Sequence, residues 1–183
     1  MNRIGRMRRE FCRWSVGLSM LASLVPASLT GAKAADELPT ESVLPVSLAM
    51  RALQASLARC EKEGHRIGIS IVDRSGVVRA VARGDGAPPH TIDSSRKKAY
   101  TAVGFRRSTT DIVAMLSETP ALRGLQDMNE EVLALGGGLP IVFAGEVVGG
   151  IGVAGAPGGH LDDACAQAGL DAIEALPKVP SGN

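Results

Sequence analysis

Apolar residues at helical spacing mark the beginning of the expected folded region. Within residues 42–64 they recur every three or four positions, as on one face of an α-helix. The repeating residues are Leu44, Leu48, Ala52, Leu53, Ala55, Leu57 and Cys60. A charged run at residues 61–63 followed by Gly64 is typical of a helix end, so we expect the helix to stop there.

A period of two replaces the helical period directly afterwards. Ile67, Ile69 and Ile71 alternate with neighbouring residues in the pattern of a strand that has one strongly apolar face. Residues 73–76 end in Gly76 and have the composition of a tight turn, and residues 77–83 alternate again. These patterns predict a β-hairpin.

The remaining chain carries both kinds of pattern. We expect a helix over residues 91–105, then a short helix beginning near Ser108, where Ser108 and Asp111 fit a capping box, and a turn over residues 120–128. Extended segments are expected at residues 131–135, 139–143 and 147–153, with a hairpin turn at Gly145-Glu146, before a final helix over residues 159–176. This order predicts one α+β domain, a single domain with an antiparallel sheet of about five strands flanked by helices.

The first 34 residues have the pattern of a secretory signal peptide. Arg3, Arg6, Arg8 and Arg9 form a basic region ahead of an apolar run at residues 14–25, and Ala32-Lys33-Ala34 fits a cleavage site. Arg8-Arg9 also resembles a twin-arginine signal, so export by that route or by the general pathway stays open. The apolar run is too short for a membrane span, so we expect an exported protein, periplasmic or extracellular, without a stable membrane anchor. Residues 35–41 and 177–183 are expected to be flexible ends around a domain at residues 42–176.

Removing this leader changes the charge of the protein. The leader holds six of the 20 basic residues and one of the 19 acidic residues, which leaves 14 basic and 18 acidic residues, a net charge of −4. A mildly acidic chain without a long basic run has no electrostatic basis for binding nucleic acid. Aromatic residues make up only 3% of the chain, so a deep aromatic ligand pocket is not expected.

The glycine-rich stretch at residues 149–160 contains a G-x-G-x-x-G match. A dinucleotide-binding fingerprint requires a second parallel strand carrying an acidic residue, and here only one expected helix follows. Gly150 and Gly152 instead fall within an expected strand, on the same face. Such glycines allow a helix, a neighbouring subunit or a flat ligand to approach the backbone closely.

An ordered series of motifs resembles the GlcG/HbpS family of haem-binding proteins over about residues 45–176. The series is IVD at 71–73, Gly76, RGDGA at 83–87, KAYTA at 98–102, GGGLPI at 136–141, GGIGVAG at 149–155, DDA at 162–164 and AG at 168–169. The resemblance implies an antiparallel sheet flanked by helices, a homo-oligomer and haem binding, with haem handling, degradation or redox sensing in some members.

Three histidines remain after the leader, and His90 is the leading candidate for an axial ligand of haem iron. It follows two prolines on a stiff loop, and a loop histidine bonded to nearby backbone is the alternative interpretation. His160 is the second candidate, with helix capping as its alternative, and Thr91 is a weaker oxygen ligand. Lys97 and Lys98 are candidates to pair with the haem propionates, and surface solvation is the default for both.

Two further functions and one cross-link stay open at this point. Arg83 and Asp85 border the loop that carries His90 and suggest an enzyme acting on a small carboxylate or carbonyl substrate, although no catalytic residue can be assigned. A non-enzymatic oligomeric scaffold is the other function. Cys60 and Cys165 lie on the first and last expected helices and are either disulfide-bonded or two buried side chains that never meet.

Overall fold

The computed structural model describes residues 40–175; the expected leader, residues 35–39 and the tail from 176 onward lie outside this range. Its elements, in chain order, are α1 (Val46–Lys62), β1 (Gly68–Asp73), β2 (Val78–Arg83), α2 (His90–Phe105), α3 (Thr109–Glu118), the 3-10 helix η1 (Pro120–Asp127), β3 (Gly138–Phe143), β4 (Glu146–Ala154) and α4 (Gly159–Ala172). Helix α1 begins at Val46 and not at residue 42 as expected. Pro45 disfavours helical backbone angles at the residue before it, Leu44, so the helix starts after the proline.

The strands form one antiparallel sheet in the order β2-β1-β4-β3. The α+β class is confirmed, but the expectation of about five strands is slightly wrong, because the described chain has four. The segment at residues 131–135 does not join the sheet. Its backbone turns instead toward α2, where the Leu133 N–H donates to Thr101 Oγ1 at 2.8 Å and Glu131 pairs with Arg96.

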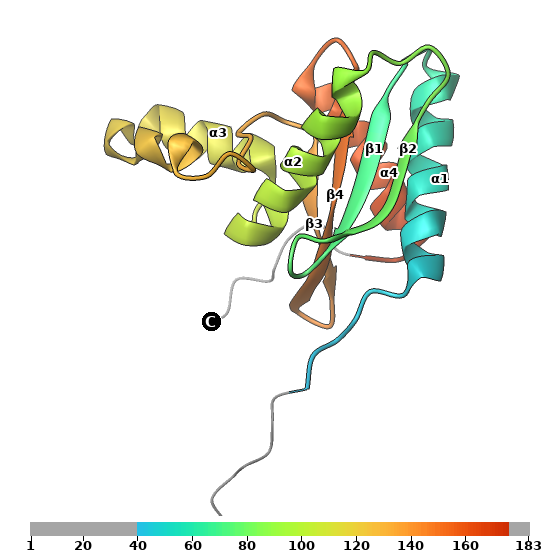
Figure 1. Cartoon of the computed structure of the whole chain (residues 1–183), viewed down its shortest axis with the longest axis horizontal. Helices are drawn as coiled ribbons and strands as arrows, with labels where there is room; N and C mark the ends of the chain where they lie inside the picture. Colours follow the sequence, from blue (N-terminus) through green and yellow to red (C-terminus); the bar gives the residue numbers. More distant parts are fainter. Residues whose placement is uncertain (1–39, 176–183) are drawn as a thin grey trace, which may run out of the picture. The chain divides into compact units, whose positions relative to one another are not determined.

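Helices cover the sheet on both faces (Figure 1). Helix α2 crosses the front in this view, and α4 lies behind the strands. The larger apolar core combines α1 and α4 with the isoleucines that point to their side of the sheet, such as Ile69, Ile71 and Ile151. A smaller cluster of Val72, Val142 and Val147 packs against Ala99 and Val103 of α2. Among the described residues no helix is both long and apolar enough to cross a membrane.

The glycines of β4 are explained by α2. A methyl group on Gly150 would lie 2.6 Å from the Ala99 carbonyl oxygen, and one on Gly152 would overlap the Ser95 carbonyl oxygen. Of the three partners left open by the sequence, a helix therefore occupies this face of the strand. The hairpin that precedes it turns at Ala144 and Gly145, both with positive φ, one residue earlier than expected.

A disulfide joins the two helices on the opposite face of the sheet. Cys60 near the end of α1 and Cys165 in the middle of α4 are bonded, with a Cα–Cα distance of 5.6 Å, and both side chains are fully buried. The alternative of two cysteines that never meet does not describe the structure. The bridge ties the first helix of the domain to the last.

Candidate ligand-binding groove

A groove opens where the first turns of α2 and α4 meet the loop between β4 and α4. Its volume is about 330 Å³. Proline, alanine and leucine side chains provide apolar walls, and the rest of the lining is polar or glycine backbone. The lining residues are Pro88, His90, Ser94, Lys98, Leu135, Ala154, Gly155, Ala156, Pro157, Gly158, Gly159 and Asp162.

His90 lies at this groove as the first residue of α2. Pro88 and Pro89 restrict the backbone in front of it, and Thr91 fixes the turn by donating both its N–H and its hydroxyl to the Pro88 carbonyl, at 3.1 and 2.7 Å. The His90 side chain is exposed and makes no hydrogen bond or ion pair with any residue of the described part of the chain. The interpretation of a histidine bonded to nearby backbone therefore has no support, and both ring nitrogens are available to a ligand.

Two of the other candidates lie away from the groove. Thr91 is completely buried, and its hydroxyl is already bonded to Pro88, so the structure contradicts its assignment as a ligand for iron. Lys97 points to the outer face of α2 and pairs with Asp93 at 3.2 Å, one turn earlier on the same helix. It lies on the surface, as its default interpretation required, and is not among the residues that line the groove.

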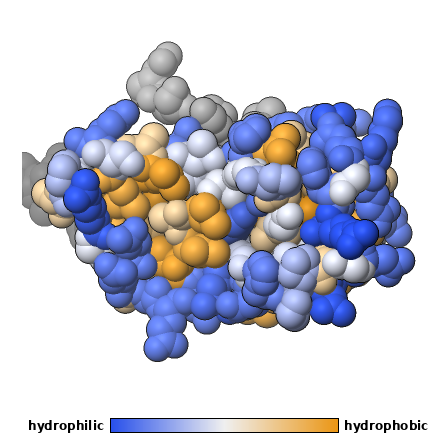
Figure 2. Space-filling view, turned by 90° about the horizontal axis from the view of Figure 1, so that it is seen from above, coloured by the Kyte–Doolittle hydropathy of each residue, from blue (hydrophilic) through white to orange (hydrophobic). Residues whose placement is uncertain are grey.

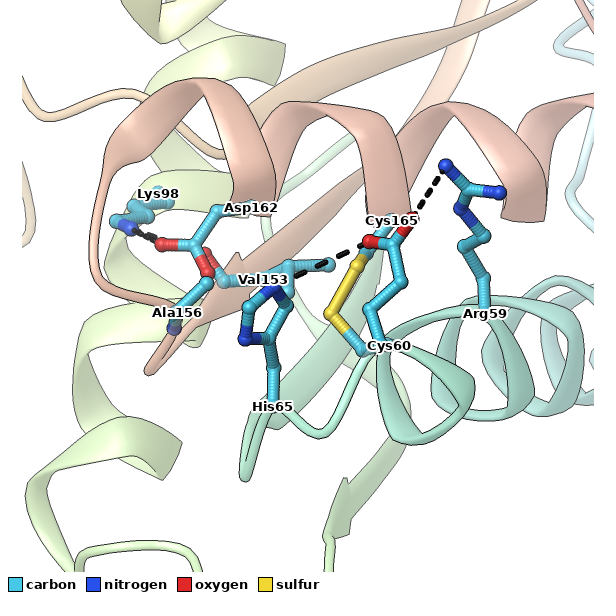
Figure 3. Close-up of a disulfide and its surroundings, with 9 residues drawn as sticks. Arg59, Cys60, His65, Lys98, Val153, Ala156, Asp162 and Cys165 are labelled. Atoms are coloured by element: carbon cyan, nitrogen blue, oxygen red, sulfur yellow. Dashed lines mark hydrogen bonds and ion pairs between the residues drawn. A yellow bond between two sulfur atoms is a disulfide. The ribbon is translucent and has the colours of Figure 1, made fainter.

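Lys98 is a buried lysine, contrary to the expectation of a surface side chain. Its ammonium group donates to Asp162 Oδ2 at 2.8 Å and to the Val153 carbonyl at 2.9 Å (Figure 3). Only 2% of the Lys98 side chain and 4% of the Asp162 side chain are exposed. Burial raises the pKa of the Asp162 carboxyl above its ordinary value, and the Lys98 ammonium opposes that shift. Because this ammonium group is buried and already donates to Asp162 and Val153, the structure gives no support for its pairing with a propionate.

His160 lines a different cavity. It follows Gly159 at the start of α4 and borders a space of about 370 Å³ together with Ser108, Leu139 and Asp163. It does not cap the helix, because the capping position is Gly158. The two candidate histidines therefore line different cavities, although the His160 ring lies beside Gly158 of the His90 groove.

Arg83 and Asp85 do not converge on a site either. Both are exposed, Arg83 at the end of β2 and Asp85 in the turn that follows, and neither lines the His90 groove. The described residues also contain no group of three or more metal-ligating side chains.

The surface around the groove is mixed in character. Figure 2 shows the top of Figure 1, where an apolar patch lies on the side of α3 and η1 and polar residues surround it. A cavity of about 250 Å³ beside α3 and η1 is lined by Val113, Leu116 and Ala134 with three polar residues. Leu135, which is 51% exposed, lines the groove.

The residue that sequence reasoning missed is Asp162. In the sequence it belongs to the DDA motif at 162–164, which by itself assigns the carboxyl group no structural or binding role. The available signal was the position of Lys98, which falls three residues after Ser95 and four before Ala102, on the face of α2 that packs inward. A lysine on a buried helix face requires an acidic partner, and the first turn of the last helix supplies one.

Comparison with known proteins places this geometry in a family. The family model described as haem degrading protein HbpS-like matches residues 44–171. A 15.0 kDa protein of Citrobacter freundii from the dhaT-dhaS intergenic region is 32% identical over 115 residues, which cover 62% of this chain and 81% of that protein. Protein GlcG of Escherichia coli K12 is 26% identical over 121 residues, covering 62% and 83% of the two chains.

Solved structures share the fold. A double mutant of HbpS from Streptomyces reticuli is 38% identical with a TM-score of 0.70, covering 80% of this chain and 97% of that one. A PduOC–haem complex is 25% identical with a TM-score of 0.69, covering 75% and 99%. The matched region spans only 31% of the corrinoid adenosyltransferase PduO of Citrobacter freundii. The extent of the family match, the shared fold and the motif series lead to one conclusion: the chain belongs to the GlcG/HbpS family of HbpS-like haem-degrading proteins.

Proposed function

We propose that this protein binds haem in the groove between the first turns of α2 and α4, where the His90 imidazole would hold the iron. The observation that carries the proposal is an exposed imidazole, unengaged by any described residue, at the edge of a partly apolar groove. Membership of the haem-degrading family and the solved complex of the related PduOC with haem support the choice of ligand.

The groove fits a partly enclosed porphyrin. A volume of about 330 Å³ lies at the lower end of the range for small-molecule sites, about 300–1,000 Å³, so the groove would hold part of the group. Pro88, Leu135 and Pro157 offer apolar contact to the ring. The first turns of α2 and α4 both border the groove, and the positive ends of two helices favour propionate groups there.

The protein's own contribution is to bind and orient the group. Pro88 and Thr91 hold the turn that presents His90, and the loop at residues 154–158 forms the facing wall. Bound haem would supply a redox-active iron whose ligation and exposure decide its chemistry. We propose haem handling outside the cytoplasm as the role, carried out by an exported homo-oligomer. Mature-protein N-terminal sequencing tests export, and light scattering tests assembly.

A haemin titration of the full chain, followed by absorbance, tests the ligand and the site. We expect a saturable Soret band at about one haem per chain, strongly weakened in His90→Ala. His160→Ala and His65→Ala are the matched controls, because these histidines lie outside the groove lining. Loss of the Soret band with time after addition of a reductant would report degradation.

Two results would count against the proposal. Uptake that never saturates would remove haem as the ligand. Saturable binding that is equal in His90→Ala and the wild type would retain haem but reject His90 as its ligand. If binding fell only in His160→Ala, the cavity beside α3 would replace the groove as the site.

A further inference from the structure

The buried Lys98–Asp162 pair connects three parts of the groove. Lys98 belongs to α2, Asp162 to the first turn of α4, and Val153, which accepts a hydrogen bond from Lys98, lies near the end of β4. The second carboxylate oxygen, Asp162 Oδ1, accepts the N–H of Ala156 at 3.0 Å, within the loop that joins β4 to α4. Figure 3 shows the carboxylate between the ammonium group and Ala156.

These contacts hold the groove wall at its start and at its middle. Val153 is held by Lys98 through its carbonyl and by Gly137 through its N–H, which donates to the Gly137 carbonyl at 2.8 Å. Ala156 is held by Asp162. Between them, Gly155 has a φ of +128°, and a methyl group there would lie 2.5 Å from the Arg66 carbonyl oxygen. The loop is therefore closely packed at Gly155, and the ion pair holds the residues on either side, Val153 and Ala156.

Stability alone is a poor reason for such a pair. Desolvating two charges costs several kcal/mol, and replacing a buried ion pair with apolar side chains is often neutral or stabilising. Here both carboxylate oxygens are used, one for the ammonium group and one for a loop amide. An apolar replacement could fill the same space but could not accept the Ala156 N–H.

We propose that Lys98 and Asp162 are positioning residues of the groove: the pair fixes the loop at residues 154–158 against α2 and thereby sets how long the groove retains its ligand. The pair acts through the loop because almost none of either side chain is exposed. The consequence for ligand retention rests on the proposed haem function, whereas the consequence for the loop does not.

Hydrogen exchange of the ligand-free full chain, measured on peptides that cover residues 153–158, tests the positioning directly. In Asp162→Asn we expect exchange in this loop to rise at least about tenfold, the effect of losing one charge-assisted hydrogen bond, while the sheet keeps its protection. Haem dissociation, measured by transfer to apomyoglobin, should speed up by a similar factor. Asp171→Asn is the matched control, because Asp171 is exposed on the same helix and its carboxylate bonds, among the described residues, only to Gln167.

A folded Asp162→Asn variant with wild-type exchange in the loop would overturn the proposal. If this variant does not fold, Lys98→Met/Asp162→Leu replaces it, and fast loop exchange is still expected there. Failure of both variants to fold would also overturn the proposal, because the pair would then be a requirement of the core. If loop exchange rises but the wild type binds no haem, the positioning stands and the haem function fails.

Discussion

Removing the Cys60–Cys165 disulfide should lower the free energy of unfolding by about 4.7 kcal/mol. The bridge joins residues 105 positions apart, and the loop-closure entropy of a ring of about 100 residues corresponds to this amount at 25 °C. Both cysteine side chains are buried, so Cys60→Ala/Cys165→Ala is the suitable change; replacement by serine would bury two hydroxyl groups. For a domain of this size the loss should lower Tm by about 15 °C.

Thermal and urea unfolding, followed by circular dichroism, measure this cost. All proteins would carry Cys12→Ala, because the third cysteine of the chain could otherwise exchange with the pair. Wild type treated with dithiothreitol should match the alanine variant, and the variant itself should not respond to the reductant. A loss below about 1 kcal/mol, or two free thiols in the oxidised wild type, would refute the reasoning.

Further predictions concern packing and the buried pair. Gly152→Ala should lower the free energy of unfolding by at least about 1–3 kcal/mol in urea melts, because its methyl group overlaps the Ser95 carbonyl oxygen. Gly104→Ala is the control: a methyl group there meets no atom within 4 Å, so it should stabilise the helix by about 0.5–1 kcal/mol. Lys98→Met should cost about 3–5 kcal/mol by leaving the Asp162 carboxylate buried without its partner, which the same melts would measure. Because the folded-state pKa of Asp162 is raised, its contribution to stability should fall as pH rises from about 4 through that pKa. Urea melts at a series of pH values should show this fall in the wild type and lack it in Asp162→Asn. The same pH profile in both proteins would contradict the prediction.

The class and order of the elements were predictable because they depend on local pattern. The alternation of Ile67, Ile69 and Ile71 reflects the sheet face that packs against α1 and α4, although both faces of β1 are buried. The helix expected at residues 91–105 appears as His90–Phe105. The cap at Ser108 is also confirmed, since its hydroxyl accepts the Asp111 N–H at 3.0 Å. Each of these signals lies within a few residues of the structure that it predicts.

The features that escaped prediction depend on distant partners. Residues 131–135 have a strand-like composition. The Leu133 N–H, however, donates to the side chain of Thr101, some thirty residues earlier, and not to a neighbouring strand. Lys98 is separated by 64 positions from the carboxylate that neutralises it, so nothing near it in the chain signals burial of its charge. The groove joins residues 88–98 to residues 154–162, and only the order of strands in the sheet brings these segments together.

The disulfide has a consequence for proteolysis. It closes a covalent ring that contains every strand, α2, α3 and η1, so a single cut within η1 leaves the two fragments attached to each other. The groove takes one wall from each fragment, since His90 precedes such a cut and Gly158 follows it. A nicked molecule would run as one species on a non-reducing gel and as two after reduction, and it would keep both walls of the groove in one covalent unit.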